Sequence, residues 1–149
     1  MRNQIRVWNP HTEELMELKD MDDYDYIWQL DECGDILLTH TKGIESENFE
    51  ATPMMLTPYF DDDGEHVWEG DVLNTNIGYG VVTVDNDNQY VVDMLWGDFD
   101  RFVLADILDN QYAVVHGNMF EVSDEELQDD LHTYRVDYGA RRDYRVKQN

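Results

Sequence analysis

Cysteine, basic residues and long apolar runs are scarce in this chain of 149 residues. Cys33 is the single cysteine, so no disulfide forms within the chain, and we expect the reducing cytoplasm as its location. No stretch approaches the roughly 18 apolar residues of a membrane span. The first residues, Met-Arg-Asn-Gln-Ile-Arg, precede no apolar run, which argues against a signal peptide.

Residue types that usually carry catalysis are few or badly placed. The two serines, Ser46 and Ser123, lie in no nucleophile motif, and the glycines form no phosphate-binding loop. The histidines do not share metal-ligand spacing with one another or with Cys33. We therefore expect no catalytic residue, no metal and no cofactor.

Two weaker chemical signals are left. The run from Asp61 to Gly64 resembles part of a calcium loop, but the EF-hand register would place Tyr59 and Gly70 at its end positions. That excludes an EF-hand and leaves a weak surface cation site open. Carboxylate pairs suited to glycoside hydrolysis arise by chance among 34 acidic residues. A sugar platform is disfavoured because the tryptophans lie in strand segments and are expected to pack in the core: Trp8, Trp28, Trp68 and Trp96.

The charge is strongly one-sided, with a net value of −24. Between Val7 and Tyr134 only Lys19, Lys42 and Arg101 oppose 32 acidic residues, which gives this body a net charge of −29. The other basic residues lie at the two ends of the chain. Such a body repels nucleic acid, anionic membranes and ATP, and it attracts basic surfaces from a distance at low salt.

Short alternating segments predict a mainly β (α+β) fold, a small antiparallel barrel with an SH3-like sheet core. The strongest hairpin signal flanks residues 85–88. Ser123 and Glu126 form a capping box for a short C-terminal helix whose Leu127, Leu131 and Tyr134 share one face. Segments 19–25 and 41–52 are expected to be loops. The predicted strands are residues 5–8, 15–18, 26–30, 36–40, 56–59, 67–73 with a bulge at Gly70, 80–84, 89–95, 101–104 and 112–119.

We predict three parts along the chain. Residues 1–55 form an N-terminal β-hairpin region packed on the core, and residues 56–134 form the β core with its helix. Residues 135–149 form a basic, mobile tail.

Three segments, residues 5–9, 56–72 and 114–121, together resemble the YopX-like proteins of phages and prophages. The match is most specific in the middle segment, where five residues fall in register with the family pattern: Asp61, Gly64, Glu69, Gly70 and Asp71. Pro58 and His116 depart from that pattern. The resemblance implies a phage or prophage origin, a host-cell cytoplasmic location and a mainly β domain, and it implies no enzymatic activity. The matching residues are expected to determine the fold.

Three acidic clusters are the candidate partner-binding residues, with solvated surface as the alternative for each. The first cluster is Asp20, Asp22, Asp23 and Asp25. The second cluster is Asp61, Asp62, Asp63 and Glu65. The third cluster is Asp124, Glu125, Glu126, Asp129 and Asp130.

The leading hypothesis is a non-enzymatic phage protein that occupies a basic, nucleic-acid-binding surface of a host protein. A nucleic-acid mimic that inhibits a host defence system, of the anti-restriction or anti-CRISPR type, fits that description. The first alternative is a self-assembling structural or regulatory phage protein of the YopX-like family, in which the acidity only serves solubility and the basic tail could dock onto the acidic body of a neighbouring copy. A carbohydrate- or metal-dependent enzyme is the least favoured alternative.

Overall fold

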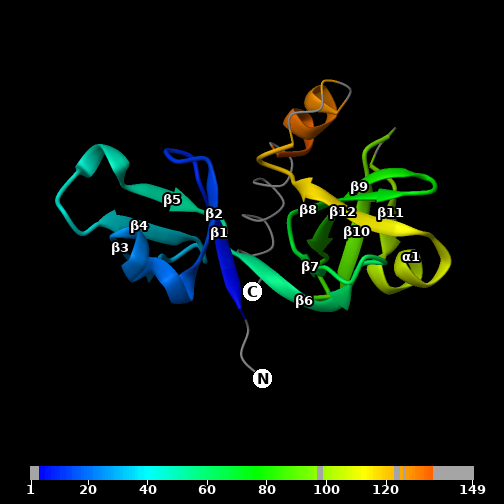
Figure 1. Cartoon of the computed structure of the whole chain (residues 1–149), viewed down its shortest axis with the longest axis horizontal. Helices are drawn as coiled ribbons and strands as arrows, with labels where there is room; N and C mark the ends of the chain where they lie inside the picture. The colour runs from blue at the N-terminus through cyan, green and yellow to red at the C-terminus, as the bar shows by residue number, and fades with distance from the viewer. Residues whose placement is uncertain (1–3, 97–98, 123–124, 126, 136–149) are drawn as a thin grey trace. The chain divides into compact units, whose positions relative to one another are not determined.

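Antiparallel β-sheets dominate the computed structural model, which describes residues 4–96, 99–122, 125 and 127–135 (Figure 1). The chain divides between Met55 and Leu56 into two compact units, each with its own apolar core. We call residues 4–55 the N-terminal unit and residues 56–135 the C-terminal unit. The predicted mainly β fold class is confirmed.

The N-terminal unit contains two predicted hairpins, and both are confirmed by strand pairing. In the first, β1 (Ile5–Asn9) pairs with β2 (Glu14–Glu17), and β1 also pairs with Met54 and Met55 at the start of β6 (Met54–Phe60). In the second, β3 (Tyr26–Leu30) pairs with β4 (Ile36–His40). A third strand, β5 (Phe49–Ala51), completes a sheet of order β3-β4-β5.

Three elements of this unit were not predicted. The acidic segment after β2 is a 3-10 helix, η1 (Leu18–Tyr24). This turn is stabilised because Met21 is buried in the core of the unit. Strand β5 is too short to show a period, although Phe49 and Ala51 alternate inward around exposed Glu50. A single turn of 3-10 helix, η2 (Glu45–Glu47), precedes it. Local turns and very short strands of this kind depend on packing that no sequence period records.

The C-terminal unit is built on a five-stranded sheet that curls into a half-barrel, with strand order β11-β10-β9-β8-β12. The part of β6 from Leu56 to Phe60 belongs to this unit and pairs antiparallel with β7 (His66–Trp68). The sheet strands are β8 (Asp71–Thr75), β9 (Gly78–Val84), β10 (Tyr90–Met94), β11 (Arg101–Val103) and β12 (Ala113–Asn118). The predicted hairpin around residues 85–88 is confirmed as the β9–β10 pair.

Both faces of this sheet are buried. Val81 packs with the apolar residues of the C-terminal helix, residues 128–135, whereas its neighbour Val82 packs with those of α1 (Leu104–Asn110). Burial on both faces explains the continuous rather than alternating apolar runs in β9 and β10. The predicted shared face of Leu127, Leu131 and Tyr134 agrees with the structure, in which all three are buried in one core cluster. The predicted capping box, Ser123 with Glu126, and the tail from residue 136 lie outside the described residues.

Two predictions for this unit need correction. Residues 67–73 are two strands, not one bulged strand, because the chain turns at Glu69 and Gly70. Gly70 has φ +91°, its N–H donates to Val82 O at 2.7 Å, and its C=O accepts from Met119 N–H at 2.8 Å. The predicted strand at residues 101–104 ends at Val103, since Leu104 begins α1 and is buried with Ile107 one turn later. None of the described helices has the length and apolar character needed to cross a membrane.

Candidate functional site

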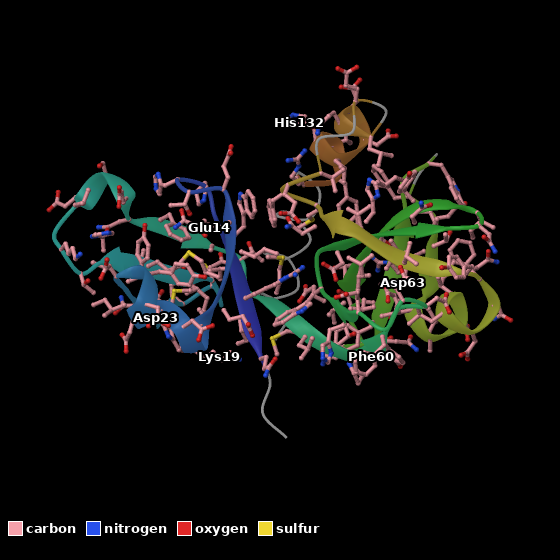
Figure 2. The ribbon with its side chains drawn as sticks, viewed as in Figure 1. Glu14, Lys19, Asp23, Phe60, Asp63 and His132 are labelled. Carbon is pink, nitrogen blue, oxygen red and sulfur yellow. The ribbon has the colours of Figure 1, made fainter. Side chains whose placement is uncertain are left out.

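The first acidic cluster lies on η1 and at its end. Asp22 and Asp23 are exposed, and Figure 2 labels Asp23 on this helix, whereas Asp20 is half-buried. Asp25 ends the helix in a left-handed conformation with φ +64°. Its carboxylate lies 3.2 Å from Lys42 Nζ, so that charge is already balanced within the unit. Asp22 and Asp23 are thus the members of this cluster best placed to meet a partner.

The second acidic cluster serves two different purposes. Asp61 is buried, and its Oδ1 accepts backbone N–H groups from Asp63 at 2.9 Å and Glu65 at 2.8 Å. Its Oδ2 accepts the N–H of Val115 on β12 at 2.8 Å. Asp62 continues the contact, because its Oδ2 accepts the N–H of Ala113 at 2.6 Å and its own N–H donates to Ala113 O at 3.0 Å.

These bonds commit Asp61 and Asp62 to the fold. Val115 and Ala113 direct these N–H groups away from β8, toward the outer edge of the sheet. The two carboxylates therefore cover a strand edge that would otherwise be open to pairing with another chain. Asp62, Asp63 and Glu65 are all exposed on this loop. Because the carboxylate of Asp62 is engaged by β12, Asp63 and Glu65 are the members of the second cluster best placed to meet a partner.

Glu69, Gly70 and Asp71, which follow this loop and match the YopX-like pattern, also have structural roles. Asp71 is buried, and its Oδ2 accepts the N–H of Trp68 at 2.7 Å across the turn. Glu69 is fully buried. The pKa of Tyr90 is raised, first by the partial burial of Tyr90 itself and then by the nearby charge of Glu69. Together with Gly70 these residues shape the β7–β8 turn, as expected of fold determinants.

The third acidic cluster is only partly described. Asp129 and Asp130 lie on the outer face of the C-terminal helix, and they and Glu125 are exposed. Asp124 and Glu126 lie outside the described residues. Asp129 and Asp130 thus present carboxylates to solvent opposite the buried side of that helix, and Glu125 does so from the turn before it.

All three basic residues of the acidic body are engaged by carboxylates of their own unit. Lys42 pairs with Asp25, and Lys19 Nζ lies 3.8 Å from Glu17. Arg101 makes a two-pronged contact with Asp93, Nε to Oδ1 at 2.7 Å and a second nitrogen to Oδ2 at 3.0 Å. The hydrogen bond to Asp93 raises the pKa of Arg101. These cations therefore do little to balance the remaining acidic surface.

The acidic surface also affects the pKa of an exposed tyrosine, Tyr112. Tyr112 donates its hydroxyl to Asp63 Oδ1 at 3.3 Å. The charge of Asp63 is the main reason that the pKa of Tyr112 is raised, with Asp62 and Asp61 adding to it. The carboxylates of this loop thus oppose ionisation of the Tyr112 hydroxyl.

A further acidic group was missed by sequence reasoning. Carboxylate oxygens of Asp31, Asp35 and Glu50 lie within 4.8 Å of one another. Asp31 Oδ1 accepts the N–H groups of Cys33 and Asp35 at 2.9 Å, and a hydrogen bond with Glu50 lowers the pKa of Asp31. Oxygen donors of this kind suit Ca²⁺ or Mg²⁺. Glu50 lies on β5, and the pairing of β5 with β4 brings its carboxylate to this group. The sequence shows no period that would have identified β5.

The expected burial of the tryptophans is wrong for two of them. Trp28 is 46% exposed on β3, and Trp96 is 36% exposed, with its indole N–H donating to Asp100 at 3.1 Å. Trp8 and Trp68 are half-buried. Period-two alternation cannot distinguish a central strand from an edge strand, and β3 is an edge strand.

Comparison with known proteins adds no relative: the chain matches no protein-family model and no curated protein. The resemblance to the YopX-like proteins stays a prediction from the three sequence segments.

Proposed function

We propose that this chain is a non-enzymatic phage or prophage protein that binds a basic surface of a host protein. The observation that carries the proposal is the uncompensated acidic surface. Asp22, Asp23, Asp63, Glu65, Asp129 and Asp130 are exposed, while Lys19, Lys42 and Arg101 are already paired. So large an excess of one charge repels itself and destabilises the compact state, and it exceeds what solubility requires.

A basic surface that normally binds nucleic acid is the best complement to this protein. Duplex DNA presents one negative charge per roughly 1.7 Å of its axis, and proteins read that charge with arginine and lysine. Carboxylates held on a β scaffold meet the same side chains through charge-assisted hydrogen bonds. The protein would then act as a nucleic-acid mimic.

The class of target follows from the phage origin that the sequence resemblance implies. Host defence nucleases, such as restriction complexes and CRISPR effectors, carry extended basic surfaces for DNA or RNA. Occupying such a surface blocks the nuclease without any chemistry by the inhibitor.

The test is co-purification of the tagged full chain from host lysate at low and at high salt, followed by mass spectrometry. We expect nucleic-acid-binding proteins to be retained at low salt and released at high salt, because screening weakens exposed charge contacts. Duplex DNA added as a competitor should also release them.

A charge-neutralised variant sharpens this test. Changing Asp22→Asn, Asp23→Asn, Asp63→Asn and Glu65→Gln removes exposed charge and alters side-chain shape very little. Retention should fall in that variant and persist in a control with Asn86→Ser and Gln89→Ser, two exposed neutral positions. Retention that ignores salt, DNA and the neutralised carboxylates would contradict the proposal.

A further inference from the structure

The outer edge of β3 is an open edge of the N-terminal sheet. The bonds from Thr41 N–H to Asp25 O at 2.8 Å and from Asp31 N–H to Asp35 O at 2.9 Å fix the hydrogen-bonding alternation of the β3–β4 hairpin. Ile27 and Gln29 therefore direct their backbone groups toward β4, whereas Tyr26, Trp28 and Leu30 direct theirs outward. Within the described residues, β4 is the only strand that pairs with β3.

This edge carries large apolar side chains that are left in solvent. Ile27 is 57% exposed, Trp28 46% and Leu30 63%. Trp28 is paired in register with Leu38 and Leu30 with Ile36, and both of these β4 partners are buried in the core of the unit. Trp28 and Leu30 thus extend the core layer to an uncovered rim. Soluble proteins usually blunt such an edge with lysine, proline or a bulge, and β3 contains none of these.

A groove runs beside the edge where η1 approaches β3. Its volume is about 250 Å³, and its lining includes Leu18 and Met21 from η1 together with Tyr26, Ile27 and Trp28 from β3. Lys19 and Asp22 also line it. Lys19 Nζ lies 3.8 Å from a Glu17 carboxylate oxygen, which offsets its charge, and Asp22 adds an exposed carboxylate at this end of the apolar strip. At the other end the strand runs directly into Asp31 and Glu32. Apolar surface in the middle and carboxylates at both ends define the ligand that this edge fits.

We propose that the outer edge of β3 and the groove beside η1 bind an extended basic segment of a partner protein as an added β-strand. The segment has apolar residues at alternate positions opposite Trp28 and Leu30, and lysine or arginine at its two ends. Five paired residues span about 17 Å, which separates the two sets of basic residues by that distance. Main-chain hydrogen bonds supply affinity in such strand addition, and the side chains supply selectivity.

Charge decides between this partner and a second copy of the chain. In an antiparallel β3–β3 dimer, the Asp22 end of one copy would face the Asp31 and Glu32 end of the other. Like charges brought together in this way cost free energy, whereas a basic segment gains at both ends. The inference rests on the proposed function for the sign of the partner's charge, and it adds the place and mode of contact.

The probe is a fluorescent synthetic peptide, Lys-Lys-Val-Thr-Val-Thr-Val-Lys-Lys, titrated with the full chain at low salt. Two control peptides carry glutamate in place of lysine, or proline in place of the central valine. We expect the basic peptide to bind, the glutamate peptide not to bind, and the proline peptide to bind more weakly because proline removes a strand hydrogen bond. Amide exchange should slow at Trp28 and Leu30, and remain unchanged at Ile27 and Gln29, which already pair with β4.

Variants of the chain locate the contact. The double variant Trp28→Thr with Leu30→Thr keeps strand propensity and should weaken peptide binding about tenfold or more, since central aromatic anchors dominate such contacts. Ile77→Thr removes an exposed apolar side chain of similar exposure, 41%, from the C-terminal unit and should leave affinity unchanged. Far-ultraviolet circular dichroism and the thermal midpoint establish that each variant is folded.

The possible failures are distinct. If the double variant binds the basic peptide as tightly as the parent and the charge-neutralised variant does not, this inference is overturned while the proposed function stands. If the glutamate peptide binds at the β3 edge as well as the lysine peptide, the basic partner is excluded, and with it the proposed function. If the chain dimerises in light scattering and the double variant does not, the edge belongs to a second copy. Failure of the basic peptide to bind at all also overturns the inference.

Discussion

The carboxylate of Asp61 accepts the backbone N–H of Val115 at 2.8 Å, across 54 positions of the chain. The same carboxylate closes its own loop through the N–H groups of Asp63 and Glu65. One buried side chain therefore links the loop after β6 to the outer strand of the half-barrel. An acidic residue that looks like part of a binding surface in the sequence is a structural acceptor.

Replacing Asp61 should destabilise the protein strongly. Asp61→Ala leaves three backbone N–H groups without their acceptor, and we expect a loss of about 2–3 kcal/mol in the free energy of unfolding. Asp61→Asn keeps one carbonyl oxygen and should lose less. Urea denaturation measures both, with Asp87→Ala in the exposed β9–β10 turn as a control that changes stability by less than about 0.5 kcal/mol. Equal effects of Asp61→Ala and Asp87→Ala would show that the contact contributes nothing.

The C-terminal helix should loosen when Tyr134 loses its hydroxyl. Tyr134 is fully buried and donates to Asp93 Oδ2 at 2.8 Å, beside the Arg101 pair. Tyr134→Phe keeps the packing of the ring and should cost about 1–2 kcal/mol. Faster amide exchange in residues 128–135 would accompany that loss. Tyr112→Phe, at an exposed tyrosine, serves as the control, and an equal effect there would contradict the prediction.

The phenol of Tyr112 should titrate above the usual range of tyrosine. The negative charge of Asp63 opposes formation of the phenolate, so the pKa of Tyr112 is raised. Asp63→Asn removes that charge and should lower the pKa toward the ordinary value, as should added salt. Phenolate absorbance during an alkaline titration gives the measurement, by comparison with the same titration of Tyr112→Phe. If Asp63→Asn leaves the midpoint in place, the charge of Asp63 is not its cause.

Salt should stabilise this protein. Raising ionic strength from about 0.01 to 0.15 M shortens the screening length from about 30 to 8 Å, and self-repulsion in a body of net charge −29 falls accordingly. We expect the thermal midpoint to rise with sodium chloride, and to rise less in the charge-neutralised variant. A midpoint that falls over this range would mean that attractive ion pairs outweigh the repulsion.

Hairpins were the part of the fold that sequence predicted best. The β3–β4 and β9–β10 pairs form where strand-forming residues flank short polar turns, and there local preference and tertiary structure agree. The shared face of Leu127, Leu131 and Tyr134, which the structure buries in one cluster, followed from a helical period. These signals are local, so a single sequence contains them.

Elements that depend on distant packing were not predictable in the same way. Helix α1 packs Leu104, Ile107 and the partly buried Leu108 against the core, but it has only 7 residues, which is too short a period to distinguish from the end of a strand. In η1, Met21 is buried and Leu18 is partly buried against the same core, and two apolar residues are too few to show a helical period. Trp28 is exposed because β3 is an edge strand. The apolar-polar alternation within one strand does not predict its position in the sheet.

In the acidic clusters, too, the sequence predicted the exposed residues but not the contacts between residues that are distant along the chain. Their position in the sequence identified exposed carboxylates at Asp22, Asp23, Asp63 and Glu65. It did not separate these from Asp61 and Asp62, whose partners on β12 lie about 50 residues later. The carboxylate group of Asp31, Asp35 and Glu50 went unnoticed because it needs the pairing of β4 with β5.

The order of the loop and of β12 along the chain has a consequence for biosynthesis. Ribosomes make the N-terminal part first, so Asp61 and Asp62 exist well before the strand whose edge they cover. When β12 leaves the ribosome and joins β8, acceptors for its outward N–H groups are already present. The last strand of the half-barrel can close at once, without an interval in which it could pair with a neighbouring nascent chain.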